Sequence, residues 1–229
     1  MKKSLIAVLM VVGALLPASG GARTADFNCT GFHSGTFANV VVPAGQSCVL
    51  DHAQVTGNVT VKTAASLSVT TTSGDTTIAG KVTGNACDSI DLESTGASFR
   101  IVVGGDLNIT NCTGSSFSGG RGSSGPGTPP QSLLIGGNTK CSGNQDECVF
   151  DYAIIAGNLD CSGNFGCTLQ SDAIGNNVTA NNNTGAGATI ANSAIAGNLA
   201  CSGNVPGATN SGTPNTVSGT RSGQCSAPF

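Results

Sequence analysis

The 229-residue chain has few charges and few aromatic side chains. Charged residues make up 9% of it, aromatic residues 4%, and there is no tryptophan. This inventory excludes a wide globular core, because aromatic side chains supply much of the buried area in such cores. The formal net charge of −3 also has the wrong sign for a protein that binds nucleic acid through a basic surface. We therefore expect a narrow core and no nucleic-acid partner.

Long apolar runs are confined to the start of the chain. Lys2 and Lys3 precede an apolar stretch at 5–16, and small residues follow at 17–22. This order is typical of a secretory signal peptide and predicts cleavage after Ala22, with Ala25 as the alternative. No later run approaches the roughly 18–20 apolar residues of a membrane-spanning helix, so we expect no membrane span. The expected location is secreted, periplasmic or in the cell envelope.

The chain also lacks metal-binding motifs. It contains only two histidines, and no two cysteines are spaced as Cys-Xaa-Xaa-Cys. Zinc and iron–sulfur sites usually need such groupings of ligands. The calcium-binding nonapeptide of secreted β-rolls is represented only by the fragment Gly104-Gly105-Asp106. We expect no metal and no other cofactor.

Glycine is abundant, with 34 residues, and many glycines belong to a repeated decapeptide. Ile155–Asn164 and Ile195–Asn204 both read Ile-Ala-Gly-Asn-Leu-Xaa-Cys-Ser-Gly-Asn, and a related copy begins at Ile135. Degenerate copies begin at Val55, Val82, Val103 and Ile174. A unit that returns every 20 residues or so is typical of a solenoid.

Within each unit the apolar residues are spaced by two, as in a β-strand. Leu159 and Cys161 show this spacing, and so do Cys167 and Leu169. Glycine and asparagine end these short runs and suit corners with unusual backbone angles. We therefore predict an all-β fold, a single-stranded parallel β-helix with about 20 residues per coil. An antiparallel sandwich also has short strands, but it does not require near-identical motifs at one period.

The repeat divides the chain into segments. We expect a signal peptide (1–22), an N-terminal cap with the first strands (23–54), β-helix coils (55–204) and a C-terminal cap tail (205–229). Between Val103 and Ile135 the spacing jumps to 32 residues. The Gly/Ser/Pro-rich stretch 113–131 accounts for this jump and is expected to loop out.

Cysteines are expected to cap and lock the coils. Ten follow the predicted signal peptide: Cys29, Cys48, Cys87, Cys112, Cys141, Cys148, Cys161, Cys167, Cys201 and Cys225. An even number in an exported chain indicates disulfides. Pairing of neighbours would give Cys29–Cys48, Cys141–Cys148, Cys161–Cys167 and Cys201–Cys225. The alternative joins stacked cysteines, Cys141 with Cys161 and Cys148 with Cys167. Sequence alone leaves both open.

Asparagine recurs at two positions of the unit. One column comprises Asn138, Asn158, Asn177 and Asn198, and the other comprises Asn144, Asn164, Asn183 and Asn204. We interpret both as structural ladders, in which stacked amides hydrogen-bond along the rod and tolerate left-handed corners. The alternative is a polar groove that binds sugar or calcium.

Acidic residues are the candidates for catalysis. β-Helices that resemble pectate lyases and polygalacturonases cut acidic polysaccharides with clustered aspartates. Here the tightest groups are Asp88, Asp91 and Glu93, and Asp146, Glu147 and Asp151. Neither group contains an Asn-Xaa-Asp, Asp-Asp or Gly-His-Gly run. Arg100 and Lys140 could stand near them, while His33 and His52 lie toward the N-terminal cap. We interpret the acids as solvated surface and predict no catalytic residue.

Two resemblances follow from the repeat. The coil size and the Val-Xaa-Gly-Asn-Val pattern resemble bactofilin-type, polymer-forming β-helices over Val55–Asn204, which implies a capacity for self-association. The Gly-Asn-Leu-Xaa-Cys-Xaa-Gly-Asn repeat, with Gly223-Gln224-Cys225 near the end, resembles uncharacterised exported bacterial proteins. This second resemblance implies a right-handed, pectin-lyase-like β-helix in the cell envelope or outside the cell, with no activity attached.

Three classes of function remain. The first is an exported structural or surface protein whose Thr/Ser/Asn-covered sheet meets glycans, cell-surface polymers or another copy. The second is a polysaccharide-active lyase or hydrolase. The third is an ice- or surface-binding protein, suggested by Thr60 and by the threonines at 70–72. The positions aligned with Thr60 in later coils interrupt such an array: Asn108, Lys140, Asp160, Thr179 and Ala200. We therefore expect the first class.

Overall fold

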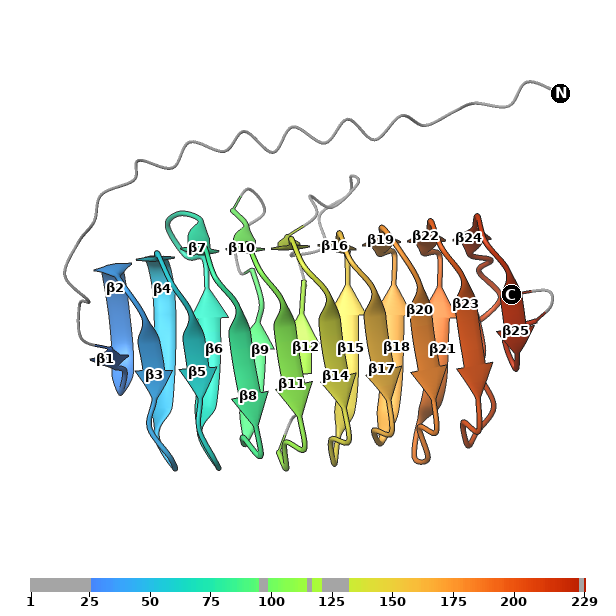
Figure 1. Cartoon of the computed structure of the whole chain (residues 1–229), viewed down its shortest axis with the longest axis horizontal. Helices are drawn as coiled ribbons and strands as arrows, with labels where there is room; N and C mark the ends of the chain where they lie inside the picture. Colours follow the sequence, from blue (N-terminus) through green and yellow to red (C-terminus); the bar gives the residue numbers. More distant parts are fainter. Residues whose placement is uncertain (1–25, 95–98, 115–116, 121–131, 227–228) are drawn as a thin grey trace, which may run out of the picture.

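The computed structural model describes residues 26–94, 99–114, 117–120, 132–226 and 229. They form an all-β parallel solenoid of about 8 turns with about 21 residues per turn (Figure 1). No helix occurs among these residues, and hence none that could cross a membrane. The predicted fold class is confirmed. The predicted signal peptide lies outside the described residues.

Each turn contributes strands to three faces. The first face is a ten-stranded sheet of β1 (Phe27–Asn28), β3 (Val40–Val42), β5 (Val59–Val61), β8 (Val82–Asn85), β11 (Leu107–Thr110), β14 (Thr139–Ser142), β17 (Leu159–Ser162), β20 (Val178–Asn181), β23 (Leu199–Ser202) and β25 (Arg221–Gly223). The second face consists of β2 (Gly31–Phe37), β4 (Ser47–Val55), β6 (Ser66–Thr70), β9 (Ser89–Leu92), β12 (Phe117–Gly119), β15 (Glu147–Asp151), β18 (Gly166–Gln170) and β21 (Gly187–Ala191). The third face consists of β7 (Thr76–Ile78), β10 (Ile101–Val103), β13 (Leu133–Ile135), β16 (Ala153–Ile155), β19 (Ala173–Ile174), β22 (Ala194–Ile195) and β24 (Thr216–Val217).

The second and third faces belong to one 15-stranded sheet. The long strand β4 joins them, because it pairs with β6 through its first half and with β7 through Gln54 and Val55. His52, with a φ of 48°, marks the bend between the two halves. Strand β2 follows β4 along both halves, so that its Thr36 lies beside Gln54 at the start of the third face.

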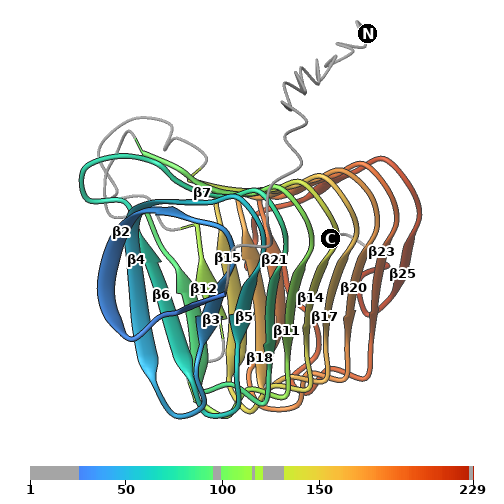
Figure 2. The same ribbon diagram turned by 60° about the vertical axis from the view of Figure 1, so that its left-hand side comes forward.

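The coil is right-handed. In Figure 1 the first-face strands lie in front and run downward, the second-face strands lie behind and run upward, and the turns advance from left to right. This is the usual hand for connections between parallel strands. Figure 2 shows that the turns stack along one axis, so that equivalent strands of successive turns are neighbours.

The corner between the first and second faces repeats one backbone conformation. One residue with a positive φ turns the chain there in successive turns: Gly45, Ala64, Ala86, Asn111, Gly143, Gly163, Asn182 and Gly203. Glycine adopts this conformation freely and asparagine tolerates it. This requirement explains the Gly or Asn at that place in six of the eight turns, whereas Ala64 and Ala86 adopt the same conformation as alanines.

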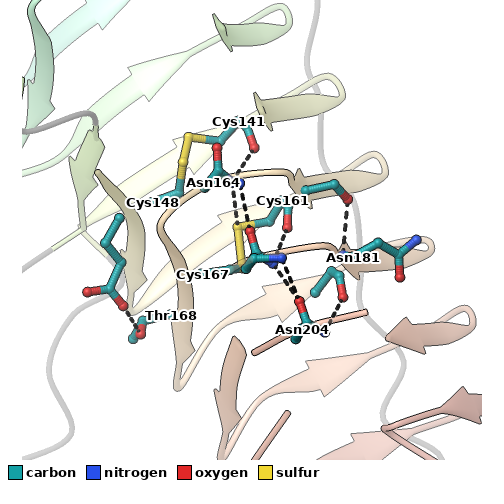
Figure 3. Close-up of a disulfide and its surroundings, with 12 residues drawn as sticks. Cys141, Cys148, Cys161, Asn164, Cys167, Thr168, Asn181 and Asn204 are labelled. Atoms are coloured by element: carbon teal, nitrogen blue, oxygen red, sulfur yellow. Dashed lines mark hydrogen bonds between the residues drawn. A yellow bond between two sulfur atoms is a disulfide. The ribbon is translucent and has the colours of Figure 1, made fainter. Parts of the chain in front are cut away.

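A narrow core runs the length of the rod. Inward and outward residues alternate, so that Cys141 and Cys161 are buried while their neighbours Lys140 and Asp160 point outward. Aliphatic residues and cysteines fill most of the core, as the composition predicts. The cysteines are all buried and form five disulfides: Cys29–Cys48, Cys87–Cys112, Cys141–Cys148, Cys161–Cys167 and Cys201–Cys225. Neighbours in sequence therefore pair, and the stacked alternatives Cys141–Cys161 and Cys148–Cys167 do not form. Cys87 and Cys112 are neighbours in sequence that are also stacked in successive turns. Figure 3 shows two of these bridges in successive turns.

The expectation that 113–131 loops out is wrong for part of this stretch. Phe117–Gly119 forms β12, which pairs with β9 on one side and β15 on the other. Phe117 is buried against Phe150, with ring centroids 4.7 Å apart. A side chain at Gly119 would collide with the Phe117 ring, so glycine makes room for it. Residues 115–116 and 121–131 lie outside the described part of the chain.

The two ends of the core are closed differently. At the first turn the Phe27 ring stacks on Phe37, at a centroid distance of 4.5 Å, and meets the His33 ring edge-on. At the other end the segment 205–229 supplies β24 and β25, and Phe229 is buried in the core with Cys225. The segment predicted as a C-terminal cap thus also continues the sheets.

Candidate functional site

The acidic residues lie mainly on or beside the second face and are held by hydroxyl groups of neighbouring turns. Ser66 donates to Asp88, Ser118 donates to Glu93, and Thr168 donates to Glu147. No group of three or more His, Cys, Asp or Glu side chains that could hold a metal exists among the described residues. Lys140 lies on the first face beside Asp160, away from these acids. The carboxylates are therefore spread along the rod.

A groove of about 750 Å³ lies at the start of the third face. Its floor consists of three outward side chains on adjacent strands, Thr36, Gln54 and Thr77, which are in register. Its remaining lining is Gly35, His52, Asp75 and Phe99. Hydroxyl, amide, imidazole and carboxylate groups thus face one space beside a single aromatic ring, and these groups can donate and accept hydrogen bonds.

The segment 71–75 forms a wall of this groove and is fixed by Asp51. The Asp51 carboxylate accepts hydrogen bonds from the hydroxyl of Thr70 and from both the backbone N–H and the hydroxyl of Thr72. Burial raises the pKa of Asp51, but these hydrogen bonds, with a contribution from His52, outweigh it and leave the pKa below its usual range. Asp51 is thus an ionised anchor for the wall.

Further contacts fix two of the groove's side chains, those of Asp75 and His52. Asp75 Oδ1 accepts a hydrogen bond of 2.8 Å from the backbone N–H of Arg100, which joins 71–75 to the next turn beside Phe99. The His52 ring lies over Gly74, where a Cβ would come within 3.0 Å of it, and its Nδ1 is 3.3 Å from Ser73 Oγ. The groove is therefore built on side chains with defined positions, as binding sites usually are.

The third face changes character beyond the groove. The outward column that begins with Thr36, Gln54 and Thr77 continues in register through Val102, Leu134, Ile154, Ala173 and Ala194. These five side chains, which we call the apolar track, are partly buried except for the exposed Ala194. Thr216 follows them on β24. The column is thus polar at both ends and apolar over five turns between.

The exposed asparagine column forms a ladder along one corner. Asn138, Asn158 and Asn177 each accept hydrogen bonds at Oδ1 from the backbone N–H of the next asparagine, and Asn198 accepts one from Thr220. Asp106 begins this run by accepting a hydrogen bond from the backbone N–H of Asn138. Because these amide oxygens are engaged with the neighbouring turn, the column serves the rod itself.

The second asparagine column is buried and also forms a ladder (Figure 3). Each amide oxygen accepts from the backbone N–H of the preceding turn, in the order Asn144, Asn164, Asn183 and Asn204. Gln224 ends the ladder by accepting hydrogen bonds from the backbone and side chain of Asn204. Both asparagine columns thus have a structural role, and neither lines the groove.

A third polar column lies at the corner between the second and third faces and is buried. The sequence did not predict it. Asp172 Oδ1 accepts from the N–H of Ala153, Ser193 Oγ from Asp172, and Asn215 Oδ1 from Ser193. Asp172 is only 2% exposed, and its Oδ2 has no hydrogen-bond partner in the described residues. Burial, reinforced by the nearby Asp151 charge, raises the pKa of Asp172 well above its usual range.

Asp172→Asn is expected to stabilise the protein at neutral pH and to have little effect in acid. Because the pKa of Asp172 is raised in the folded state, the stability that its protonated carboxyl group contributes is fully present below the unfolded pKa, near 3.8. This stability is lost as the pH rises through the folded pKa. Asparagine stays neutral. The advantage of the variant should grow by about 1.4 kcal/mol per pH unit above pH ~4, until the raised pKa is reached.

Urea denaturation of parent and Asp172→Asn between about pH 3 and pH 8 measures this difference. Asn215 shows that an amide fits such a position, since its Nδ2 donates to the Ile190 carbonyl. A difference in unfolding free energy that does not change with pH would mean that Asp172 titrates normally.

Comparison with protein-family models, with curated proteins and with solved structures finds no match to this chain.

Proposed function

We propose that this protein is an exported structural or surface β-helix protein that binds glycans without catalysis, and that the groove is its glycan-binding site. The observation that carries this proposal is the in-register floor of Thr36, Gln54 and Thr77 beside the Phe99 ring. Sugar hydroxyls need such hydrogen-bonding groups, and the apolar face of a sugar ring can pack on an aromatic side chain. A rigid scaffold holds the backbone under these groups in place and so reduces the entropy lost on binding.

Export is part of the proposal. The order of charged, apolar and small residues in 1–22 is that of a signal peptide. Five disulfides would persist in an oxidising compartment, such as the cell envelope or the outside of the cell. Such a compartment contains cell-surface polysaccharides, which are the ligands we propose.

A glycan array probed with the mature protein tests this function, and a reducing-sugar assay on the same glycans tests for cleavage. We expect binding without release of reducing ends. Gln54→Ala should weaken binding about fivefold, because one lost hydrogen bond typically contributes on the order of 1 kcal/mol. The matched control is Gln170→Ala, an exposed strand residue on the second face, which should bind as the parent does.

Three results would contradict the proposal. Equal weakening by Gln54→Ala and Gln170→Ala would place binding elsewhere, and absence of binding to every glycan would remove the proposed ligand class. Turnover of any polysaccharide, polyuronates above all, would instead support the lyase or hydrolase alternative.

A further inference from the structure

The apolar track is unusual for a solvent-facing sheet. Over five turns the outward positions of β10, β13, β16, β19 and β22 carry no charged or hydrogen-bonding side chain. The next outward position is glycine or alanine in each of these turns: Gly104, Gly136, Ala156, Gly175 and Ala196. By contrast, the first face presents Lys140, Asp160 and Thr179 at equivalent outward places. A narrow apolar strip therefore runs between polar surfaces.

The track begins where the groove ends. Val102 lies directly beside Thr77, the last floor residue of the groove, in the pairing of β10 with β7. The two features therefore share one straight column of side chains, in which the hydrogen-bonding floor comes first and the apolar strip follows. A ligand that fits both must have a polar end and an apolar tail.

The size of the track favours a small ligand over a protein. Five turns at about 4.8 Å per strand give a length of roughly 19 Å, and two outward residues give a width of roughly 7 Å. The resulting area is on the order of 150 Å², far below the ~800 Å² per partner of a stable protein interface. A second copy of this chain would therefore gain too little from this strip, whereas a single extended hydrocarbon chain could lie along it.

We infer that the groove and the apolar track together bind an amphipathic glycan, a sugar headgroup carrying one hydrocarbon chain. This inference rests on the proposed function, because the sugar occupies the same groove. The headgroup contacts Thr36, Gln54 and Thr77, and the chain extends over Val102, Leu134 and Ile154 toward the C-terminal end of the rod. Among the described residues, the groove is lined by the Asp75 carboxylate and by no Lys or Arg, so neutral headgroups fit better than anionic ones.

The test compares three probes by isothermal titration calorimetry, with both surfactants kept below their critical micelle concentrations. Maltose offers a sugar alone, dodecyl maltoside offers the same sugar with a chain, and dodecylphosphocholine offers the chain on a headgroup that is not a sugar. We expect dodecyl maltoside to bind at least about tenfold more tightly than maltose, because its chain removes apolar surface from water. Dodecylphosphocholine should bind more weakly than dodecyl maltoside.

Variants of the apolar track test where the hydrocarbon chain of the ligand lies. Ile154→Asp should reduce the advantage of dodecyl maltoside over maltose to less than about threefold, while Ile154→Thr, which keeps the β-branched shape suited to a strand, should reduce it in part. The matched control is Val149→Asp, an equally half-buried outward position of the same turn on the second face, which should keep the full advantage. Circular dichroism confirms that each variant is folded.

Each remaining outcome has a definite meaning. Dodecyl maltoside that binds no better than maltose overturns the inference and leaves the proposed function standing. Equal binding of dodecyl maltoside and dodecylphosphocholine would indicate adsorption of any surfactant and also overturns it. If glycans bind on the array but dodecyl maltoside does not bind at all, the inference fails alone. If no glycan binds on the array and dodecyl maltoside does not bind either, both proposals fail.

Discussion

Asn164→Ala is expected to lower the free energy of unfolding by about 3–5 kcal/mol. Asn164 is buried, and its Oδ1 accepts from both the backbone N–H and the Nδ2 of Asn144, each at 3.0 Å. Its Nδ2 donates to the Cys141 carbonyl at 2.9 Å. Alanine would remove these three buried hydrogen bonds, and the Asn144 Nδ2 would keep only the Ile109 carbonyl at 3.5 Å and the sulfur atoms of Cys141 and Cys148. Each buried polar group left without a good partner costs about 1–3 kcal/mol. Because the corner can relax in part, we expect the loss in unfolding free energy to be smaller than the sum of the largest costs per group.

Asn158→Ala is the matched control, since Asn158 holds the equivalent place in the exposed ladder. Its Oδ1 accepts from the backbone N–H and the Nδ2 of Asn177, the same two donors. Water can replace these bonds at the surface, so we expect a loss below about 1 kcal/mol. Urea denaturation followed by circular dichroism measures both variants. Similar losses in the two would contradict the role that we assign to burial.

Removal of the Cys201–Cys225 disulfide, by changing both residues to alanine, is expected to cost about 3–4 kcal/mol. The two cysteines are 24 residues apart, and a loop of this length restricts the unfolded chain by about that amount. Both sulfur atoms are buried, so some packing is lost as well. Because each turn rests only on its neighbours, loss of the last bridge should loosen the C-terminal turn before the rest of the rod.

The shorter bridge Cys141–Cys148 provides the comparison. It closes a separation of only 7 residues, and its removal should cost about 1 kcal/mol less on the same loop-length argument. Hydrogen exchange should show faster exchange in β24 and β25 for the Cys201–Cys225 variant and in β14 and β15 for the Cys141–Cys148 variant. Uniform acceleration along the whole rod in either variant would mean that the turns unfold as one unit.

The sequence predicts the fold because the same residue types recur wherever the backbone needs them. Leu159 and Cys161 face the core and Gly163 turns the corner, and the same three residue types return two turns later as Leu199, Cys201 and Gly203. Strand β12 escaped prediction because it depends on one residue, Phe117, and periodicity cannot be seen in a single apolar side chain. The cysteine pairing stayed open because both arrangements are consistent with a coil of 20 residues.

The third polar column was not predictable for a different reason. Its members share a hydrogen-bonding task but not a residue type: Thr76, Asp172, Ser193 and Asn215 are buried, and each accepts from a backbone N–H of the neighbouring turn. A hydroxyl, a carboxyl or an amide oxygen can each accept from a backbone N–H, so the sequence shows no repeat there. The asparagine ladders were visible because one residue type is kept in every turn.

The groove had no sequence signal, whereas the apolar track had one that could be read. The groove requires the loop 71–75 and Phe99 to stand beside the third face, and neither belongs to the repeat. The track consists of the residue that precedes the buried Val or Ile at the start of each repeat unit, as in Leu134-Ile135 and Ile154-Ile155. With the inward position fixed by the alternation, the residue before it must point outward.

The most direct test of this account asks which face of the rod meets the ligand. A ¹H–¹⁵N correlation spectrum of the labelled protein, recorded during titration with a glycan that binds on the array, reports this residue by residue. The account predicts shifts at Thr36, Gln54, Thr77 and Phe99, with no shifts on the first face or on the second-face strands beyond β4. Shifts centred on first-face residues such as Thr179, or on second-face residues such as Thr168, with none in the groove, would contradict it.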